Sequence, residues 1–259
     1  MPSRRRLVVS RKFAEALQRV RWADEQILEL KARSSKFFNP ETHRRFKEVD
    51  PKSSHVIDKI KLDPLPDPIV RNVVQIIESL RFALDYAASA VTPVQWRKKT
   101  YFPFGDTKRD MDATIKSNRC KHIPDEIKVL FASFKPYKRG NPPLWALNKI
   151  CNTTKHRAII EPGISVKDFS FEDFWQVGET GALPFAPRWD RRKNEVVISR
   201  ALGKGTIHHD VEFSVGIKFG KVPVFSGMPV PSVLRYLASR VEKILWLTES
   251  EARKIGIVK

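Results

Sequence analysis

The sequence predicts one α+β domain, mainly a helical bundle, with a small antiparallel β-hairpin or sheet inserted before the C-terminal helix. Apolar residues recur at helical spacing in several segments and alternate with polar residues at strand spacing near residues 195–226. With 259 residues and 41% hydrophobic content, the chain can bury a sizeable core. We therefore expect helices at about 11–31, 69–91, 124–159 and 232–248, the β insertion at about 195–226, and a single domain over 1–259.

Apolar stripes predict two long helices in the first hundred residues. In the first, residues 11–31, the stripe follows spacings of three, four and seven and comprises Phe13, Leu17, Val20, Ile27 and Leu30. In the second, it comprises Ile69, Val73, Ile76, Ile77, Leu80, Leu84, Ala87 and Val91, and the helix ends before Thr92-Pro93. Five prolines in residues 34–68 favour a connector with one short strand near residues 56–62.

A basic loop is predicted at residues 94–121, where eight Lys and Arg side chains stand against three Asp. Trp96, Tyr101, Phe102 and Phe104 are interleaved with these cations, a pattern that can stack bases and hold phosphates. The same segment can instead pack onto the core, and we favour burial for Phe102 and Phe104.

The remaining elements alternate between helical and strand periods. One helix is predicted from Pro124 to before Pro136, a turn at residues 140–143, and another helix at residues 144–159. Alternation predicts strands at residues 195–200 and 206–219, and a turn at Gly220-Lys221 would lead into a strand at residues 222–225 to make a hairpin. The amphipathic final helix would complete a bundle with the helices at residues 69–91 and 144–159.

Charge and composition indicate a class of partner. The chain has 48 Lys and Arg against 29 Asp and Glu, a formal net charge of +19, which attracts polyanions. Nucleic acid is the first expectation and an anionic membrane surface the second. The final helix carries Arg235, Arg240 and Lys243, but its apolar face is expected to pack inward and so is not available to a membrane. No segment is apolar enough for a signal peptide or a membrane-spanning helix, so we expect a cytoplasmic protein.

Several kinds of site lack sequence support. Cys120 and Cys151 are far apart and outside any CxxC, so neither a disulfide framework nor a zinc site is predicted. His208 and His209 would point to opposite faces of one strand and could not share a metal. P-loop, GxGxxG, GxSxG and HExxH motifs do not occur. We expect no metal and no cofactor.

The most informative segment is LNKICNTTKHR at residues 147–157. On a helix, Asn148, Asn152 and His156 would share one stripe, with Lys155 beside them. Residues 128–157 hold seven Lys and Arg and no Asp or Glu, which predicts contact with phosphates. The candidate nucleic-acid-binding residues are Lys135, Lys138, Arg139 and Lys149.

The segments LRFALDYAA (80–88), YFPF (101–104), FKPY (134–137) and LNKICNTTKHR together resemble a group of uncharacterised bacterial helical proteins with an N-x-x-KHR motif. In that group, a helix with a leucine-aspartate pair precedes an FPI-type and a QPY-type segment and a helix ending in asparagine plus DKHR. The group is similar, at a distance, to HEPN-like proteins, many of which are metal-independent ribonucleases or nucleotide-binding toxin and defence modules. The resemblance covers roughly residues 69–160.

The resemblance implies roles for individual residues. Matched to the motif are His156, Arg157, Asn152, Asp85 and Arg81. Thr154 stands where the group usually has aspartate, and Lys149, Ile150 and Cys151 stand where a HEPN nuclease has arginine.

Two hypotheses follow. In the first, the chain binds nucleic acid, RNA favoured, and is an endoribonuclease in which His156 takes the 2′-hydroxyl proton, Lys155 or Arg157 stabilises the phosphorane, and Asn152 orients the phosphate. Asp85, Arg81 and Asn148 would support this site. In the second, the chain is a non-catalytic basic binding module whose Asp85 and His156 form a structural polar lock. For the Asp85 and His156 cluster, we favour the structural role of the second hypothesis. Whether the chain forms a homodimer is left open by the sequence.

Overall fold

The computed structural model describes residues 10–38, 44–153, 160–166, 174–177, 182–183, 188–190, 193–201, 206–209 and 213–258. It is a mixed structure of helices and strands that is mostly helical. Where the sequence predicted one domain, the chain forms two compact units, each assembled from separate segments. The first unit comprises Met1–Leu30, Arg71–Ile159 and Phe219–Lys259, and the second comprises Lys31–Val70 and Ile160–Lys218.

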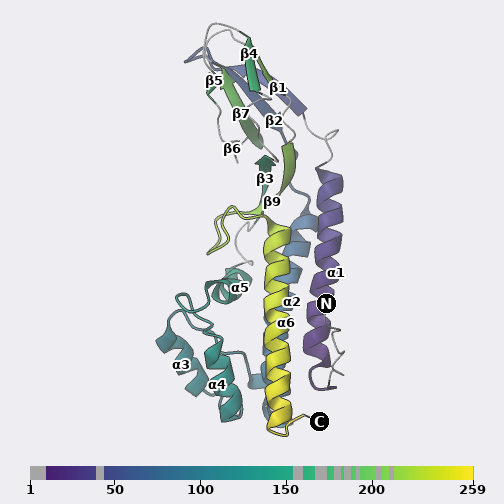
Figure 1. Cartoon of the computed structure of the whole chain (residues 1–259), viewed down its shortest axis with the longest axis vertical. Coiled ribbons are helices and arrows are strands. Elements are labelled where there is room, and N and C mark those ends of the chain that lie inside the picture. The colour runs from purple at the N-terminus through teal and green to yellow at the C-terminus, as the bar shows by residue number, and fades with distance from the viewer. Residues whose placement is uncertain are drawn as a thin grey trace. The chain divides into compact units, whose positions relative to one another are not determined.

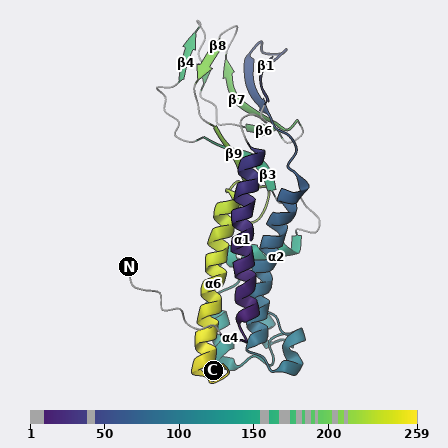
Figure 2. The same cartoon turned by 90° about the vertical axis from the view of Figure 1, so that its right-hand side faces the viewer.

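Three long helices form the core of the first unit: α1 (Ala14–Phe37), α2 (Asp67–Ala90) and α6 (Val230–Lys254). Only the end of α1 and the first turn of α2 belong to the second unit. The three helices lie side by side in both views of Figures 1 and 2. Every apolar stripe residue predicted for the first two helices is buried, as are Val233, Leu234, Leu237, Val241, Ile244 and Leu245 of α6. The hydrophobic effect of burying these stripes holds the bundle together.

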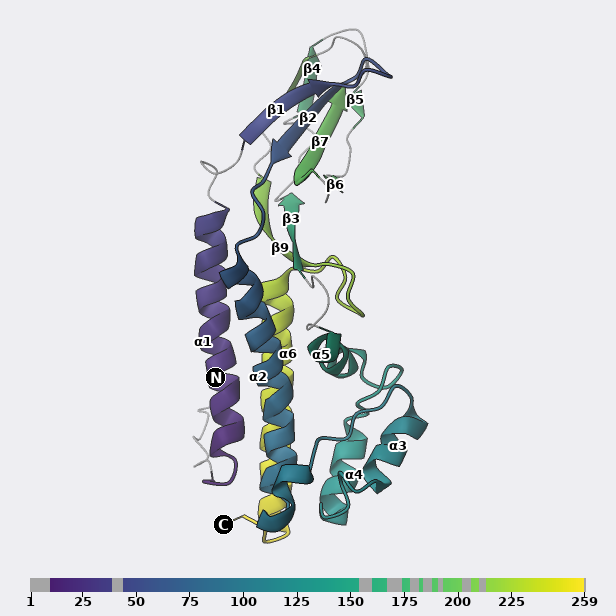
Figure 3. The same cartoon turned by 180° about the vertical axis from the view of Figure 1, so that it is seen from behind.

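Four shorter elements lie between α2 and the end of this unit: η2 (Val94–Lys99), α3 (Lys108–Lys116), α4 (Asp125–Ser133) and α5 (Pro142–Thr153). Both α4 and α5 contact α6, as the sequence predicted for the helix starting at residue 144, and α3 contacts α4 (Figure 3). Asp125 and Glu126 lie in the first turn of α4, where the helix dipole favours carboxylates. The predicted extension of α5 to residue 159 falls outside the described residues.

The prediction of a basic loop at residues 94–121 is wrong in part, because the segment contains the 3-10 helix η2 and the helix α3. A capping box starts α3: the Thr107 side chain accepts a hydrogen bond from the Asp110 N–H, and the Asp110 carboxylate accepts from the Thr107 N–H. Met111 is the buried residue of α3, and none is buried in η2, so neither element carries the apolar stripe that reveals a helix in sequence.

The second unit is built on an antiparallel sheet in the order β1-β2-β7-β5, with β6 also paired to β7. Its strands are β1 (Arg44–Val49), β2 (Val56–Lys61), β5 (Ala182–Leu183), β6 (Arg188–Asp190) and β7 (Glu195–Ala201). The predicted strands at residues 56–62 and 195–200 are confirmed as β2 and β7. The connector predicted around β2 also contains β1, and both form part of the sheet.

The predicted hairpin at residues 206–225 is wrong. The region contains two strands, β8 (Thr206–His209) and β9 (Phe213–Phe219), which pair with β4 (Phe174–Val177) and β3 (Ile160–Val166) and not with residues 222–225. The latter residues form turns, and Val224 has a left-handed φ of 67° that a strand does not allow. Alternation revealed the strands but not their distant partners.

Buried charges are paired within the second unit. Asp58 is 2% exposed and accepts from Arg45, at 3.1 Å from Nε and 2.5 Å from Nη2. Lys59 forms ion pairs with Glu48 and with Glu195, the latter at 3.2 Å. Burial acts to lower the pKa of Lys59, but the hydrogen bonds to the two glutamates and their negative charges together outweigh burial and raise it. These pairs connect β2 to both of its neighbouring strands.

Candidate nucleic-acid interface

The predicted catalytic residues are described only in part. His156, Lys155 and Arg157 lie outside the described residues, and so does the group's aspartate position at Thr154. Asn152 lies in the last turn of α5 and is exposed. The three supporting residues Arg81, Asp85 and Asn148 are all described, and the structure brings them together.

A polar cluster joins α2 to α5 and to the segment that precedes α3. Arg81 Nη1 lies 2.6 Å from Asp85 Oδ2 and Arg81 Nε donates to Asn148 Oδ1 at 2.7 Å. The Phe102 N–H donates to Asp85 Oδ1 at 2.9 Å, and the Arg81 guanidinium lies 4.5 Å from the centre of the Phe104 ring. The Arg81 and Asp85 side chains are 13% and 17% exposed. These contacts link the cluster within the protein, and the buried Arg81 Nη1 is held by the ion pair to Asp85 without a hydrogen bond.

The acid-free basic stretch predicted at residues 128–157 does not remain acid-free after folding. Lys149 lies 2.7 Å from Asp106 Oδ1, and Lys128 lies 3.0 Å from Asp125 Oδ1. The pKa of Asp106 is lowered, first by the hydrogen bond from Lys149 and second by that from the Trp145 indole at 2.8 Å. Carboxylates from outside the stretch thus neutralise two of its cations.

Three other predicted phosphate-binding residues remain exposed. Lys135, Lys138 and Arg139 all follow α4 and precede α5. Lys138 Nζ lies 5.6 Å from the centre of the Trp145 ring, which Lys149 approaches from 5.9 Å. The ring itself is only 8% exposed, so it holds cations near the surface without offering a face on which a base could stack.

A second basic surface lies on the segment between α2 and α4. Pro93 breaks α2, and Thr92 Oγ1 donates to the Ala88 carbonyl at 2.9 Å as the helix ends. The next element, η2, is stabilised at its C-terminal end, where Thr100 Oγ1 donates a hydrogen bond to the Trp96 carbonyl at 3.0 Å. Because no η2 residue is buried, its aromatic and cationic side chains face solvent.

We call the depression on this surface the aromatic groove. It has a volume of about 400 Å³ and is lined by Trp96, Lys98, Lys99, Tyr101, Asn118, Arg119, Lys121 and His122. The Trp96 and His122 rings stack with centroids 4.0 Å apart and planes 10° apart, and Trp96 is still 37% exposed. Tyr101 is 42% exposed, with the Arg119 guanidinium 5.7 Å from its ring. Four cations and no carboxylate line this groove.

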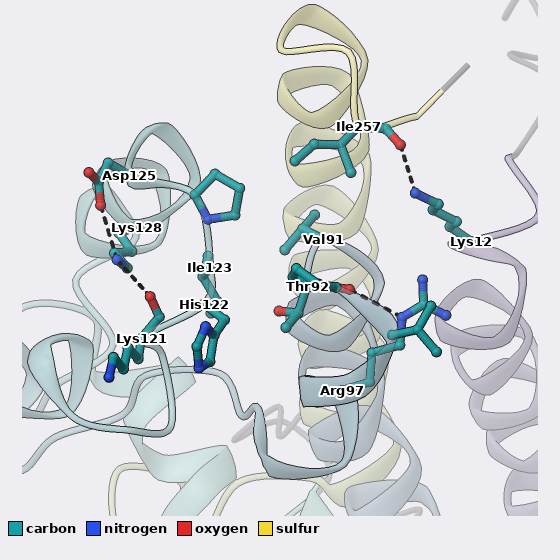
Figure 4. Close-up of a pocket in the computed structure, with 13 residues that line it drawn as sticks. Lys12, Val91, Thr92, Arg97, Lys121, His122, Ile123, Asp125, Lys128 and Ile257 are labelled. Carbon is teal, nitrogen blue, oxygen red and sulfur yellow. Dashed lines mark hydrogen bonds and ion pairs between the residues drawn. The ribbon is translucent and has the colours of Figure 1, made fainter.

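A larger depression, which we call the basic cavity, shares Lys121 and His122 with the aromatic groove. Its volume is about 630 Å³. The charged lining residues are Lys12, Arg97, Lys121, Asp125 and Lys128, and the others are His122, Thr92 and the apolar residues Val91, Pro93, Val94, Ile123, Pro124 and Ile257. Figure 4 shows Lys12 and Arg97 on one side of the cavity and Lys121, His122 and Lys128 on the other.

Long-range contacts build the Lys12 side of the basic cavity. The Ser10 N–H donates to Glu249 Oε1 at 2.8 Å, which ties the start of α1 to the end of α6. Lys12 Nζ then donates to the Ile257 carbonyl at 2.8 Å, and Arg97 Nε donates to the Thr92 carbonyl at 3.2 Å (Figure 4). The aromatic and basic residues of 94–121 stand out in the sequence, but no local pattern predicts that Lys12 lies beside them.

The described residues offer little covalent or metal chemistry at this surface. Burial raises the pKa of Cys120 to about 11, so its thiol is protonated at neutral pH and unreactive. Within the described ranges, no three His, Cys, Asp or Glu side chains are grouped so that they could hold a metal ion. The exposed rings and cations of the aromatic groove are suited to binding through stacking and charge.

Comparison with protein-family models, with curated proteins and with solved structures finds no match for this chain. Among the described helices, none is both long and apolar enough to cross a membrane.

Proposed function

We propose that this protein is a non-catalytic module that binds single-stranded nucleic acid, RNA favoured, through the aromatic groove. The observation that carries this proposal is the exposure of Trp96 and Tyr101 among four cations without a lining carboxylate. Unpaired bases stack on such rings while Lys and Arg hold the phosphates. In a duplex the base faces are stacked on one another, so a single strand gains most from this surface.

The formal net charge of +19 supports binding to a polyanion, but the local arrangement decides where it binds. At residues 128–157, Asp106 and Asp125 offset two cations. In the aromatic groove, Lys98, Lys99, Arg119 and Lys121 face no lining acid. Lys135, Lys138 and Arg139 also stay exposed, but the Trp145 ring beside Lys138 is buried. The aromatic groove combines its cations with exposed rings, which favours binding there.

The polar cluster at Asp85 supports the non-catalytic alternative. Its carboxylate already accepts from Arg81 and from the Phe102 N–H, and Arg81 also contacts Asn148. Residues arranged this way fix the packing of α2 against α5. Endoribonuclease activity at His156 stays a prediction, as does the homodimer.

The binding proposal is tested by fluorescence anisotropy with a labelled oligouridylate of about 12 nucleotides, a length within the usual site sizes for single strands. Trp96→Ala or Tyr101→Ala should weaken binding by about 5- to 150-fold, the loss of one stacked base. The matched control is Trp22→Ala, since Trp22 is 46% exposed on α1 and lines neither cavity. Equal affinities for the wild type and both groove variants would overturn the proposal.

Salt dependence separates the cations from the rings. If the four lining cations each contact a phosphate, log K should fall against log salt with a slope of about −3 between about 50 and 200 mM. Arg119→Ala should make that slope shallower by about 0.7, whereas the exposed Lys243→Ala on α6 should leave it unchanged. A slope near zero would contradict phosphate contact.

A cleavage assay tests the nuclease prediction directly. Labelled RNA is incubated in EDTA with the wild type and with His156→Ala. Intact RNA in both samples supports the non-catalytic module, whereas cleavage that depends on His156 would overturn that part of the proposal.

A further inference from the structure

We propose that the basic cavity binds the terminal phosphomonoester of a nucleic-acid strand, so that the protein prefers strands with a phosphorylated end. This inference rests on the proposed binding function and adds the chemical class of the strand end. It is carried by the charge, lining and position of the cavity.

The charge of the cavity fits a dianion. Four cations, Lys12, Arg97, Lys121 and Lys128, line it together with one carboxylate, Asp125. Lys128 pairs with that carboxylate, whereas Lys12 and Arg97 each donate to a neutral main-chain carbonyl. A carbonyl orients a cation without cancelling its charge. A phosphomonoester carries nearly two negative charges at pH 7, because its second pKa is near 6, whereas an internal phosphodiester carries one.

Cationic side chains line the cavity on two sides. Lys12 and Arg97 lie on one side of the cavity, and Lys121 and His122 lie on the other (Figure 4). The contacts of Lys12 with Ile257 and of Arg97 with Thr92 hold the first pair against the residues that follow α6 and α2. Because the two sides come from distant parts of the chain, a phosphate between them would be approached from several directions.

The volume and the apolar lining fit the rest of a terminal nucleotide. At about 630 Å³ the cavity lies within the size range of small-molecule sites. Pro93 and Val94 are exposed and contribute apolar surface beside the cations. A nucleoside can lay its ring and sugar on such surface while its phosphate contacts Lys and Arg.

The two depressions adjoin, because Lys121 and His122 line both. A strand with bases stacked at Trp96 and Tyr101 would therefore reach the basic cavity at His122, whose ring stacks on Trp96. The aromatic groove would hold the strand by its bases, and the basic cavity would hold its end.

The test compares oligouridylates of one sequence with a 5′-phosphate, with a 3′-phosphate and with hydroxyl groups at both ends. The wild type should bind one phosphorylated form at least about tenfold more tightly than the hydroxyl form, about 1.4 kcal/mol. The form that is preferred identifies the end. Equal affinities for all three oligonucleotides would overturn the inference.

Variants of the cavity and of the groove should then behave differently. Lys12→Met keeps most of the apolar stem of an exposed side chain, and Arg97→Lys keeps a charge but loses the planar fork. With either variant, the ratio of the affinities for the phosphorylated and hydroxyl forms should fall toward one. The affinity for the hydroxyl form itself should change less than threefold. Trp96→Ala should weaken all forms and keep the preference. A preference that survives both cavity variants would overturn the inference.

The same data distinguish this inference from the proposed function. If the hydroxyl form binds but phosphorylated ends add nothing, only the terminal-phosphate site fails. If none of the oligonucleotides binds at moderate salt, the proposed function fails as well.

Discussion

Breaking the polar cluster at Asp85 should lower stability far more than breaking a similar ion pair in solvent. Asp85→Ala removes the carboxylate that lies 2.6 Å from Arg81 Nη1 and accepts the Phe102 N–H at 2.9 Å. Removing one partner of a buried ion pair costs about 3–5 kcal/mol. Because the two side chains keep 13% and 17% exposure, we expect the lower end, about 3 kcal/mol.

The measurement is thermal unfolding followed by circular dichroism. About 3 kcal/mol should lower Tm by roughly 6–12 °C for a unit of this size. The matched control is Asp112→Ala, which breaks another i,i+4 ion pair of nearly the same length, 2.7 Å to Lys108, with side chains 70% and 38% exposed. That variant should unfold close to the wild type, because exposed pairs are screened.

Replacing both members of the pair provides a second control. In an Arg81→Met background, no guanidinium is left without its partner, so Asp85→Ala should cost clearly less than it does alone. If Asp85→Ala lowers Tm no more than Asp112→Ala does, the cluster is not a structural lock and the reasoning is refuted.

Two further predictions concern titratable groups. Burial raises the pKa of Cys120 to about 11, so iodoacetamide at pH 7.5 should leave this thiol unmodified in the native protein and modify it in urea. Mass spectrometry detects the modification, and rapid modification of the native protein would contradict the burial of Cys120. The pKa of Asp106 is lowered in the folded state, so its stabilising contribution is present above the unfolded pKa and is lost as the pH falls through the folded value. Asp106→Asn should therefore reduce stability at pH 7 and flatten the loss of stability below about pH 4, and equal acid unfolding of both proteins would count against this pairing.

The parts of the fold that the sequence predicted well are those with a local signature. The stripes that include Leu80 on α2 and Leu237 on α6 are apolar on one face, so their burial follows from helical spacing alone. In contrast, α3 buries Met111 and starts at a capping box, with little periodicity to reveal it. The strand β1 has mostly exposed residues, and only its pairing with β2 makes it part of a sheet.

The candidate site was predictable only where its residues are neighbours in sequence. Trp96 and Tyr101 stood out because they lie among cations in one segment. Lys12 joins them through the contact between the start of α1 and the end of α6, which no local pattern encodes. The opposite error arose at Lys149: the stretch around it has no acid in sequence, yet folding places Asp106 against it. The net charge of a sequence segment is thus a poorer guide to binding than the charge that remains unpaired once the chain has folded.

The polar cluster and the aromatic groove are joined by the dipeptide Tyr101-Phe102. Phe102 is 2% exposed and its N–H is held by Asp85, whereas Tyr101 is 42% exposed and its N–H donates to the Arg119 carbonyl at 3.3 Å. The polar cluster lies outside the groove, but through Phe102 it can position the neighbouring Tyr101 ring. Loosening the cluster should disturb binding only through that ring.

A double-mutant cycle tests this coupling. Below its Tm, Asp85→Ala should weaken binding of a single strand, but by no more than Tyr101→Ala does. The two substitutions together should bind like Tyr101→Ala alone, because the second removes the ring through which the first acts. Strictly additive losses would show that Asp85 affects the groove by another route, and a loss larger than that of Tyr101→Ala would place Asp85 in the binding site itself.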